Sequence, residues 1–127
     1  MNDCMTILAI DSETDARIEL EELVDYLPMN YEVLVAANFE IAAMRANDRS
    51  VAAVVLGVNG SDAGAWVIEQ FEALKAAYPK VTIILYMGED CTELLTGYHF
   101  GAAQIVPKPF ANALIRTIIS TAHEAAR

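Results

Sequence analysis

Five positions could carry chemistry, because each stands at or just after the end of a short apolar run. They are Asp11, Ser12, Gly57, Tyr86 and Lys108. A carboxylate can bind Mg²⁺ or act as a nucleophile, but one carboxylate alone is a poor magnesium site. Asp11 and Lys108 carry opposite charges, and a pair at hydrogen-bonding distance would gain about 1–4 kcal/mol before desolvation. Glycine at position 57 offers no side chain for any reaction.

The elements that must position these residues follow from the hydrophobic pattern. Short solid apolar runs predict strands buried on both faces, and longer stretches with helical spacing predict helices between them. The predicted strands cover residues 6–10, about 31–35, 51–56, 81–86 and 104–106. The predicted helices cover about 14–27, 39–46, 67–78, 92–100 and 111–125. Asp11, Ser12 or Thr14 is expected to cap the first helix and Asn38 the second.

This alternation predicts one α/β domain over residues 1–127, a three-layer sandwich with a doubly wound, five-stranded parallel sheet. The flavodoxin-like strand order 2-1-3-4-5 is expected. Parallel strands gather their carboxyl ends at one edge of the sheet. The five positions named above would therefore meet there, so that edge is the expected functional site.

Composition excludes several classes of function. The chain has 127 residues and a net charge of −10, with only eight Lys and Arg, which are scattered. A surface that binds nucleic acid or an anionic membrane needs clustered basic residues, so neither partner is expected. The N-terminus has no basic segment before an apolar run, which predicts a cytoplasmic protein. Cys4 and Cys91 lack metal-ligand spacing and are expected to be free thiols.

Two segments resemble a known family. Ile7-Leu-Ala-Ile-Asp-Ser-Glu13 is similar to the first strand and acidic turn of response-regulator receiver domains (CheY-like). Gly101-Ala-Ala-Gln-Ile-Val-Pro-Lys-Pro-Phe110 is similar to their last strand and Lys-Pro loop. The resemblance extends over essentially the whole chain. It implies an acidic pair that binds Mg²⁺, an aspartate that accepts a phosphoryl group, a Thr or Ser that senses it, and a lysine that pairs with it. It also implies a cis Lys108–Pro109 bond.

The sequence departs from that pattern at four of six positions. Asp11 and Lys108 match. Ser12 replaces the second acid, Gly57 the phosphoacceptor, Tyr86 the hydroxyl residue and Ile105 an aromatic. Asp11 is then the only acid expected in the pocket, because Glu13 is expected to face the first helical turn. Mg²⁺ binding is expected to be weak or absent, with Asp11 as the one weak candidate ligand. No cofactor and no enzymatic activity are expected.

Two side chains in this pocket leave alternatives open. Lys108 either pairs with Asp11 and holds the last loop against the first strand, or is an ordinary exposed lysine. Tyr86 is expected to fill the space that a phosphoryl group would need, or to end its strand with the hydroxyl in water, and the two are not exclusive.

These departures predict a phosphorylation-independent pseudo-receiver. It would control an output domain by forming a homodimer or by docking another signalling protein. Candidates for the contact face are Tyr98, Phe100, Ile105, Ile115 and Ile119. The strand ending Val54-Val-Leu-Gly57 is similar to the receiver-like N-terminal domains of flagellar σ54-dependent transcription activators, which suggests that context.

Two alternative functions are compatible with the same fold. One is a phosphoacceptor receiver of a two-component phosphorelay that uses Asp11 as a displaced carboxylate. The other is a small flavodoxin-like cofactor-binding protein. Against the second, the segment Asp11-Ser-Glu-Thr-Asp15 carries three acids and no glycine, and this composition repels a flavin phosphate.

Overall fold

The computed structural model describes residues 4–88, 91, 100–101 and 103–125. Its strands are β1 (Met5–Ile10), β2 (Tyr31–Ala36), β3 (Val51–Val58), β4 (Ile83–Met87) and β5 (Gln104–Pro107). Its helices are α1 (Thr14–Glu22), α2 (Phe39–Arg45), α3 (Gly64–Ala77) and α4 (Ala111–Ala125), with a 3₁₀ turn η1 (Leu23–Tyr26) after α1. The helix predicted over 92–100 falls almost wholly on residues outside those described.

The five strands form one parallel sheet in the order β2-β1-β3-β4-β5, as predicted. The solid apolar runs explain why β1 and β3 lie at its centre. In β1, the four residues from Ile7 to Ile10 are at most 1% exposed, because helices cover both faces of the strand. Strand β3 ends two residues later than predicted, and β4 begins two residues later and ends one residue later. Gly57 and Tyr86 therefore lie inside them and are register partners.

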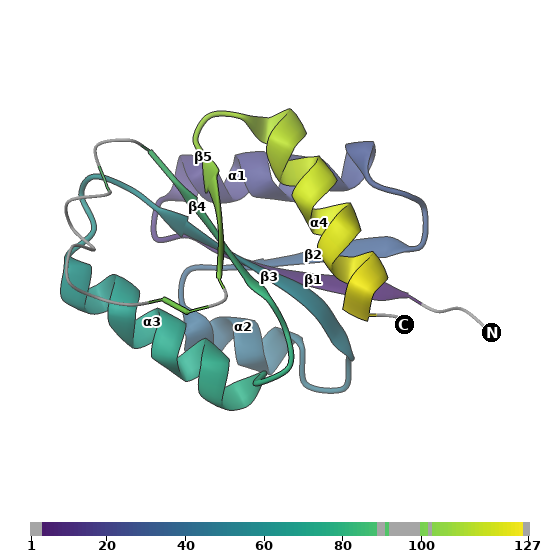
Figure 1. The fold of residues 1–127 in the computed structure, drawn as a ribbon, viewed down its shortest axis with the longest axis horizontal. Helices are drawn as coiled ribbons and strands as arrows, with labels where there is room; N and C mark the ends of the chain where they lie inside the picture. The colour runs from purple at the N-terminus through teal and green to yellow at the C-terminus, as the bar shows by residue number, and fades with distance from the viewer. Residues whose placement is uncertain (1–3, 89–90, 92–99, 102, 126–127) are drawn as a thin grey trace.

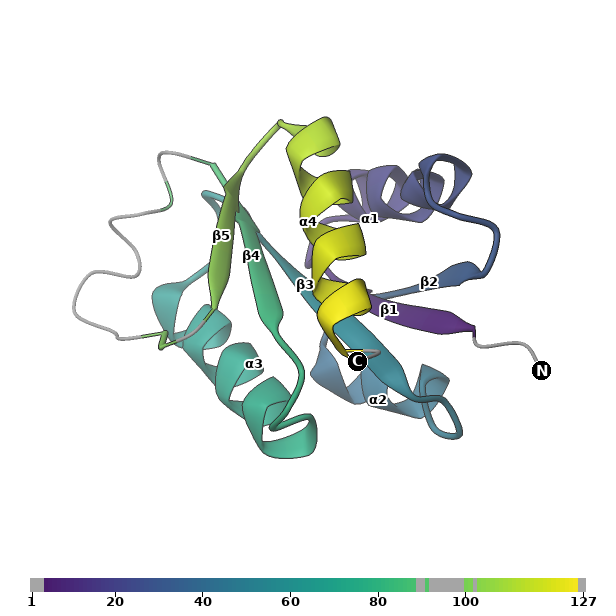
Figure 2. The same ribbon diagram turned by 45° about the vertical axis from the view of Figure 1, so that its right-hand side comes forward.

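Two helical layers enclose the sheet (Figures 1 and 2). The helices α1 and α4 cover one face, and α2 and α3 cover the other. The face beneath α1 and α4 is called here the α1/α4 face; its buried residues include Leu20, Leu114 and Ile118. The face beneath α2 and α3 buries Val67, Phe71 and Leu74.

The first helix differs from its sequence prediction in one respect. Leu20, Leu23 and Leu27 are buried as expected, but Val24 is 39% exposed. The chain tightens into the 3₁₀ turn η1 after Glu22, and three residues per turn rotate position 24 off the buried face. No helix within the described ranges is both long and apolar enough to cross a membrane.

Helix capping follows the prediction at α2 only. The Asn38 side chain accepts a hydrogen bond from the Ile41 N–H at 3.0 Å. At α1 the N-cap position is Glu13, whose side chain makes no capping bond, so the expectation for Asp11, Ser12 or Thr14 is wrong. The reason lies at the sheet edge, where partners from the loops after β3 and β5 engage the side chains of Asp11 and Ser12.

Candidate functional site

Strand alternation brings Asp11, Gly57 and Tyr86 to the α1/α4 face at the carboxyl edge of the sheet. The residue two positions before each of them packs beneath α1 and α4, and side chains two apart on a strand point the same way. Because β1, β3 and β4 are neighbours, the three positions form a row. Lys108 follows β5, next to β4, and extends this row.

Gly57 makes room for Asp11. A Cβ atom at position 57 would overlap Oδ2 of Asp11 and would lie 2.9 Å from its Cγ. The Asp11 carboxylate therefore leans from β1 across β3 into the space of the missing side chain, and Asp11 is fully buried. A carboxylate does reach the tip of the central strand, but it comes from the neighbouring strand.

Lys108 and Asn59 satisfy that carboxylate. The Lys108 ammonium lies 3.2 Å from Oδ2 of Asp11 and donates to Oδ1 of Asn59 at 2.7 Å. The Asn59 amide and the backbone N–H of Glu13 both donate to Oδ1 of Asp11, at 2.7 and 3.0 Å. The Lys108 side chain is 21% exposed, so this is a mostly buried ion pair with hydrogen bonds on both oxygens. Of the two interpretations of Lys108, the structure shows the pocket ion pair.

A second acid lies at the rim of this pocket, which corrects the expectation that Asp11 is the only one. Asp62 accepts the Ser12 hydroxyl at 2.5 Å and the Asn59 backbone N–H at 2.8 Å. Glu13 accepts the Ser61 hydroxyl at 2.9 Å, so it contacts the β3–α3 loop as well as beginning the helix. These bonds tie the loop after β3 to the turn after β1.

Tyr86 lies in the pocket with its ring buried. It is 8% exposed, and the Lys108 ammonium lies 5.5 Å from the ring centroid, within range of a cation–π interaction. Burial, with a smaller effect of the Glu19 carboxylate, raises the pKa of the Tyr86 phenol. The ring lines a small cavity of about 70 Å³ together with Leu20 and Leu114.

The residues present do not fit a magnesium ion. Mg²⁺ takes anionic and neutral oxygen ligands, whereas the Lys108 ammonium occupies one side of the Asp11 carboxylate and N–H donors occupy the other. Asp62 is likewise bound to Ser12 and Asn59. Within the described part of the chain, no three His, Cys, Asp or Glu side chains lie together as a metal site.

The residues predicted to form the contact face lie on different sides of the sheet. Ile115 and Ile119 of α4 pack partly on the α1/α4 face. Phe100 instead packs on the α2/α3 side, edge-on to Phe71 with ring centroids 4.7 Å apart. Ile105 of β5 is 62% exposed, and Tyr98 lies outside the described residues. The four described positions therefore do not form one surface.

Sequence reasoning missed Asn59 and Asp62. Both lie in the loop after β3, which was recognised only as rich in turn-forming residues. One signal was available. A buried carboxylate paired with a lysine needs further hydrogen bonds, and this loop holds the nearest polar side chains after β3.

The cis Lys108–Pro109 bond implied by the resemblance is present.

No family model matches this sequence, and no curated protein does. Solved structures do match. Brucella abortus NtrX aligns with a TM-score of 0.76 and 21% identity over 97% of this chain, which spans only 28% of the NtrX chain. A response regulator receiver domain protein from Clostridium thermocellum aligns with a TM-score of 0.74 and 17% identity, covering 96% of this chain and 97% of its own. Vibrio cholerae CheY4 aligns with a TM-score of 0.69 and 21% identity, covering 93% of this chain and 98% of the CheY4 chain. The chain has the fold of response-regulator receiver domains.

Proposed function

We propose that this chain is a phosphorylation-independent receiver domain, a cytoplasmic regulatory module that acts by protein contact and catalyses no reaction. The observation that carries the proposal is the Asp11 carboxylate lying over Gly57, where a phosphoacceptor would project. The receiver fold supports the regulatory class of function, and the altered pocket supports independence from phosphorylation. No cofactor is required by this proposal.

The pocket's own hydrogen bonds argue against phosphoryl transfer. An acceptor carboxylate must reach an incoming phosphorus atom, and Asp11 is fully buried. Each of its oxygens already accepts hydrogen bonds, from Lys108 on one side and from Asn59 and Glu13 on the other. The lysine that would pair with a phosphoryl group is held by Asp11 and Asn59. Lys108 therefore already has an anionic partner within the domain, in the place of the phosphoryl group with which it would otherwise pair.

Incubation with acetyl phosphate and Mg²⁺, followed by intact-mass spectrometry, tests this proposal. The expected result is no site-specific mass increase of one phosphoryl group. Beryllofluoride with Mg²⁺ is expected to leave the amide NMR spectrum unchanged around Asp11, Asn59 and Lys108. A saturable, single-site adduct would overturn the proposal.

A second candidate function has one specific observation in its favour. The Asp11 carboxylate occupies the acceptor's place and could be a displaced acceptor in a phosphorelay. In that reaction an Asp11 oxygen would bond to phosphorus, the bond from phosphorus to the acetate oxygen would break, and acetate would leave. Asp11→Asn separates the candidates, because an adduct on Asp11 disappears in the variant. An adduct that persists in Asp11→Asn would lie elsewhere and support neither candidate.

Partner contact is proposed at the exposed edge formed by β5 and the start of α4. Ile105 and Phe110 are 62% and 58% exposed there, beside the partly buried Ile115 and Ile119 of α4. The occupant is a second copy of the domain or another signalling protein. Ile105→Glu is expected to abolish concentration-dependent dimerisation in sedimentation velocity. Met29→Glu is the matched control, since Met29 is fully exposed on another part of the surface. Dimerisation of Ile105→Glu equal to that of the parent would contradict this face, whereas a parent that stays monomeric would leave another signalling protein as the occupant.

The proposed context is the front end of a σ54-dependent flagellar transcription activator, with an output domain elsewhere in the protein. The end of β3, with Gly57 where an aspartate would be expected, supports this context. The match to about a quarter of the longer NtrX chain supports attachment to further domains. Removal of this domain from the intact protein should change the output activity, and Asp11→Asn should change it without any phosphate donor.

A further inference from the structure

The outer side of α1 presents an apolar side chain that the core does not use. Of the two large apolar residues in α1, Leu20 is 2% exposed and packs in the core, whereas Ile18 is 53% exposed. Ile18 lines a shallow surface hollow of about 260 Å³ together with Glu21, Glu22 and Asp25. Most of the exposed lining is apolar. These four residues are called here the α1 hollow.

The acids of the α1 hollow are placed against the electrostatics of their own helix. Glu21 and Glu22 stand in the last turn of α1, where the helix dipole favours cations. Within α1, every residue of which is described, that last turn holds no basic residue. Glu21, Glu22 and Asp25 line one hollow, so like charges lie side by side and repel one another. Solubility alone does not require acids around an exposed isoleucine.

The described part of the chain offers these acids no ionic partner. Neither of the ion pairs found there involves a residue of α1 or η1. Arg17, the basic residue of α1, donates to the backbone oxygen of Asp11 and to the Thr14 hydroxyl, at the start of the helix. The α1 hollow therefore combines an exposed apolar side chain with three carboxylates whose charge the described residues leave unpaired.

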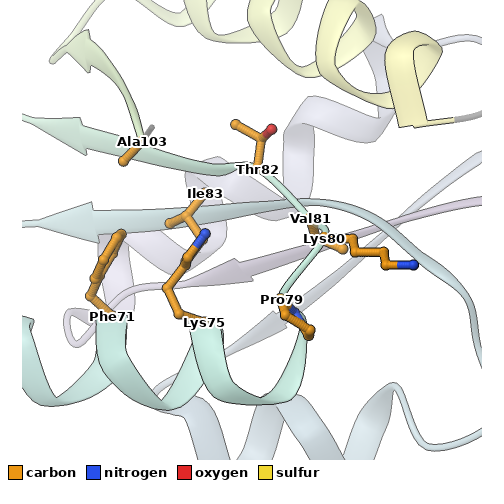
Figure 3. Close-up of a pocket in the computed structure, with 8 residues that line it drawn as sticks. All are labelled: Phe71, Lys75, Pro79, Lys80, Val81, Thr82, Ile83 and Ala103. Atoms are coloured by element: carbon orange, nitrogen blue, oxygen red, sulfur yellow. The ribbon is translucent and has the colours of Figure 1, made fainter. Parts of the chain in front are cut away.

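A second hollow on the surface carries the opposite charge. It lies at the amino end of β4, and the described residues that line it include Lys75 and Lys80 but no acid (Figure 3). Phe71 and Ile83 also line it, but they are 5% and 1% exposed and are already covered by the protein. This hollow repels a cationic ligand, so it serves as a comparison within the same molecule.

We propose that the α1 hollow binds a basic amphipathic helix of a partner protein, with an apolar side chain of that helix against Ile18 and its lysines or arginines beside the three acids. Charge complementarity selects this occupant. A helix presents side chains three and four positions apart on one side, which is also the spacing of the residues of the α1 hollow. A second copy of the chain is disfavoured, because a two-fold contact through this surface would bring the same acids together.

This surface is independent of the proposed function. It shares no residue with the contact face proposed at β5 and α4, and it does not depend on whether the Asp11 pocket accepts a phosphoryl group. Failure of the phosphorylation or sedimentation experiments above would therefore leave the α1 hollow untouched, and the reverse also holds.

The test is an NMR titration of the whole domain with a synthetic helical peptide of about 15 residues, whose leucines lie along one side between lysines. Saturable shifts are expected at the amides of residues 18–25, and none at Thr82 or Ile83 beside the lysine-lined hollow. One control peptide carries serine in place of leucine, and the other carries glutamate in place of lysine. Each control peptide is expected to bind about fivefold more weakly or less.

Matched variants test the apolar side chain. Ile18→Ser should weaken binding of the leucine–lysine peptide about fivefold, because it removes the apolar contact. Met44→Ser changes an apolar residue of α2 that is 77% exposed and should leave peptide binding unchanged. Equal binding by the Ile18→Ser variant and the parent would overturn the proposal. Concentration-dependent dimerisation that Ile18→Ser abolishes would assign the hollow to a second copy and overturn it as well.

A second pair of variants tests the charges. Glu21→Gln/Glu22→Gln should weaken peptide binding about fivefold and raise the melting temperature of the free domain, since it relieves repulsion at the helix end. Glu40→Gln/Glu69→Gln removes two exposed charges from α2 and α3 and should leave peptide binding unchanged. Equal losses in both double variants, or equal binding of the serine peptide, would show only a general attraction to a chain of net charge −10. Either result would overturn the proposal, as would a lower melting temperature of Glu21→Gln/Glu22→Gln.

Discussion

The Asp11 carboxylate occupies the space that the first carbon of any side chain at position 57 would need. Gly57 belongs to β3 and Asp11 follows β1, so this contact joins neighbouring strands at the carboxyl edge of the sheet. It explains the glycine, because the Asp11 carboxylate leaves no room for a side chain at position 57. Lys108 completes the arrangement by neutralising the buried charge.

Gly57→Ala should lower the free energy of unfolding by about 1–3 kcal/mol, because the new methyl group displaces a buried carboxylate. In an Asp11→Ala background the same change should be neutral or stabilising by about 0.5–1 kcal/mol, since alanine is favoured over glycine inside a strand. Urea denaturation of the four proteins measures this coupling. Equal effects of Gly57→Ala in both backgrounds would show that the two residues do not compete for space.

Lys108→Met should destabilise the domain by about 3 kcal/mol, because it leaves the Asp11 charge buried without its ionic partner. The double variant Asp11→Asn/Lys108→Met should lose less than the sum of the single changes. Lys80→Met, at an exposed position, is the matched control and should change stability by less than about 0.5 kcal/mol. An equally small effect at Lys108 would mean that the pair contributes nothing to the fold.

Magnesium should not raise the melting temperature of the parent domain, because a ligand stabilises only a protein that binds it. Lys108→Ala removes the ammonium from Oδ2 of Asp11 and leaves an oxygen facing the pocket. Any stabilisation by Mg²⁺ should therefore appear in this variant alone, measured against the same concentration of Na⁺ salt at matched ionic strength. A Mg²⁺-dependent shift in the parent protein would contradict the described hydrogen-bond network.

Stability should fall in acid partly through Glu32. The Thr6 hydroxyl, at 2.7 Å, and then Arg49 hold the pKa of Glu32 below its ordinary value of 4.5. A carboxylate with a lowered pKa in the folded state stabilises the fold above its unfolded pKa. That contribution is lost as the pH falls through the pKa that Glu32 has in the folded state. Glu32→Gln should remove about 0.5–1 kcal/mol at neutral pH and flatten the stability profile below pH ~4.5. Parallel profiles for the two proteins would exclude this contribution.

Stability should also fall in alkali through Tyr86. Burial raises the pKa of its phenol, so the folded state favours the neutral form. Stability that is fully present below the ordinary pKa of 10.0 is lost as the pH rises through the higher pKa that Tyr86 has in the folded state. Tyr86→Phe should make the alkaline decline of stability shallower. Tyr26 is 71% exposed, so Tyr26→Phe is the matched control and should leave the decline unchanged.

The strand order and the sheet edge followed from local patterns. Solid apolar runs in β1 and β3 can be buried only between two helical layers, and right-handed crossovers then limit the order of the strands. Asp11, Gly57, Tyr86 and Lys108 could be placed at one edge on that basis, because the ends of parallel strands coincide. The capping role of Asn38 was equally local, since it depends on residues three positions apart.

The sequence established the principal members of the site: Asp11, Lys108, and a glycine where a carboxylate would be needed for phosphorylation. The folded chain was needed to show that Asp11 fills the space over Gly57 and that Asn59 and a second acid, Asp62, complete the network. The physical reason is that these contacts join residues about 50 to 100 positions apart, as between Asp11, Asn59 and Lys108. Their geometry depends on how far each strand extends and on which way a side chain leans across its neighbour. Hydrophobic periodicity does not encode either property.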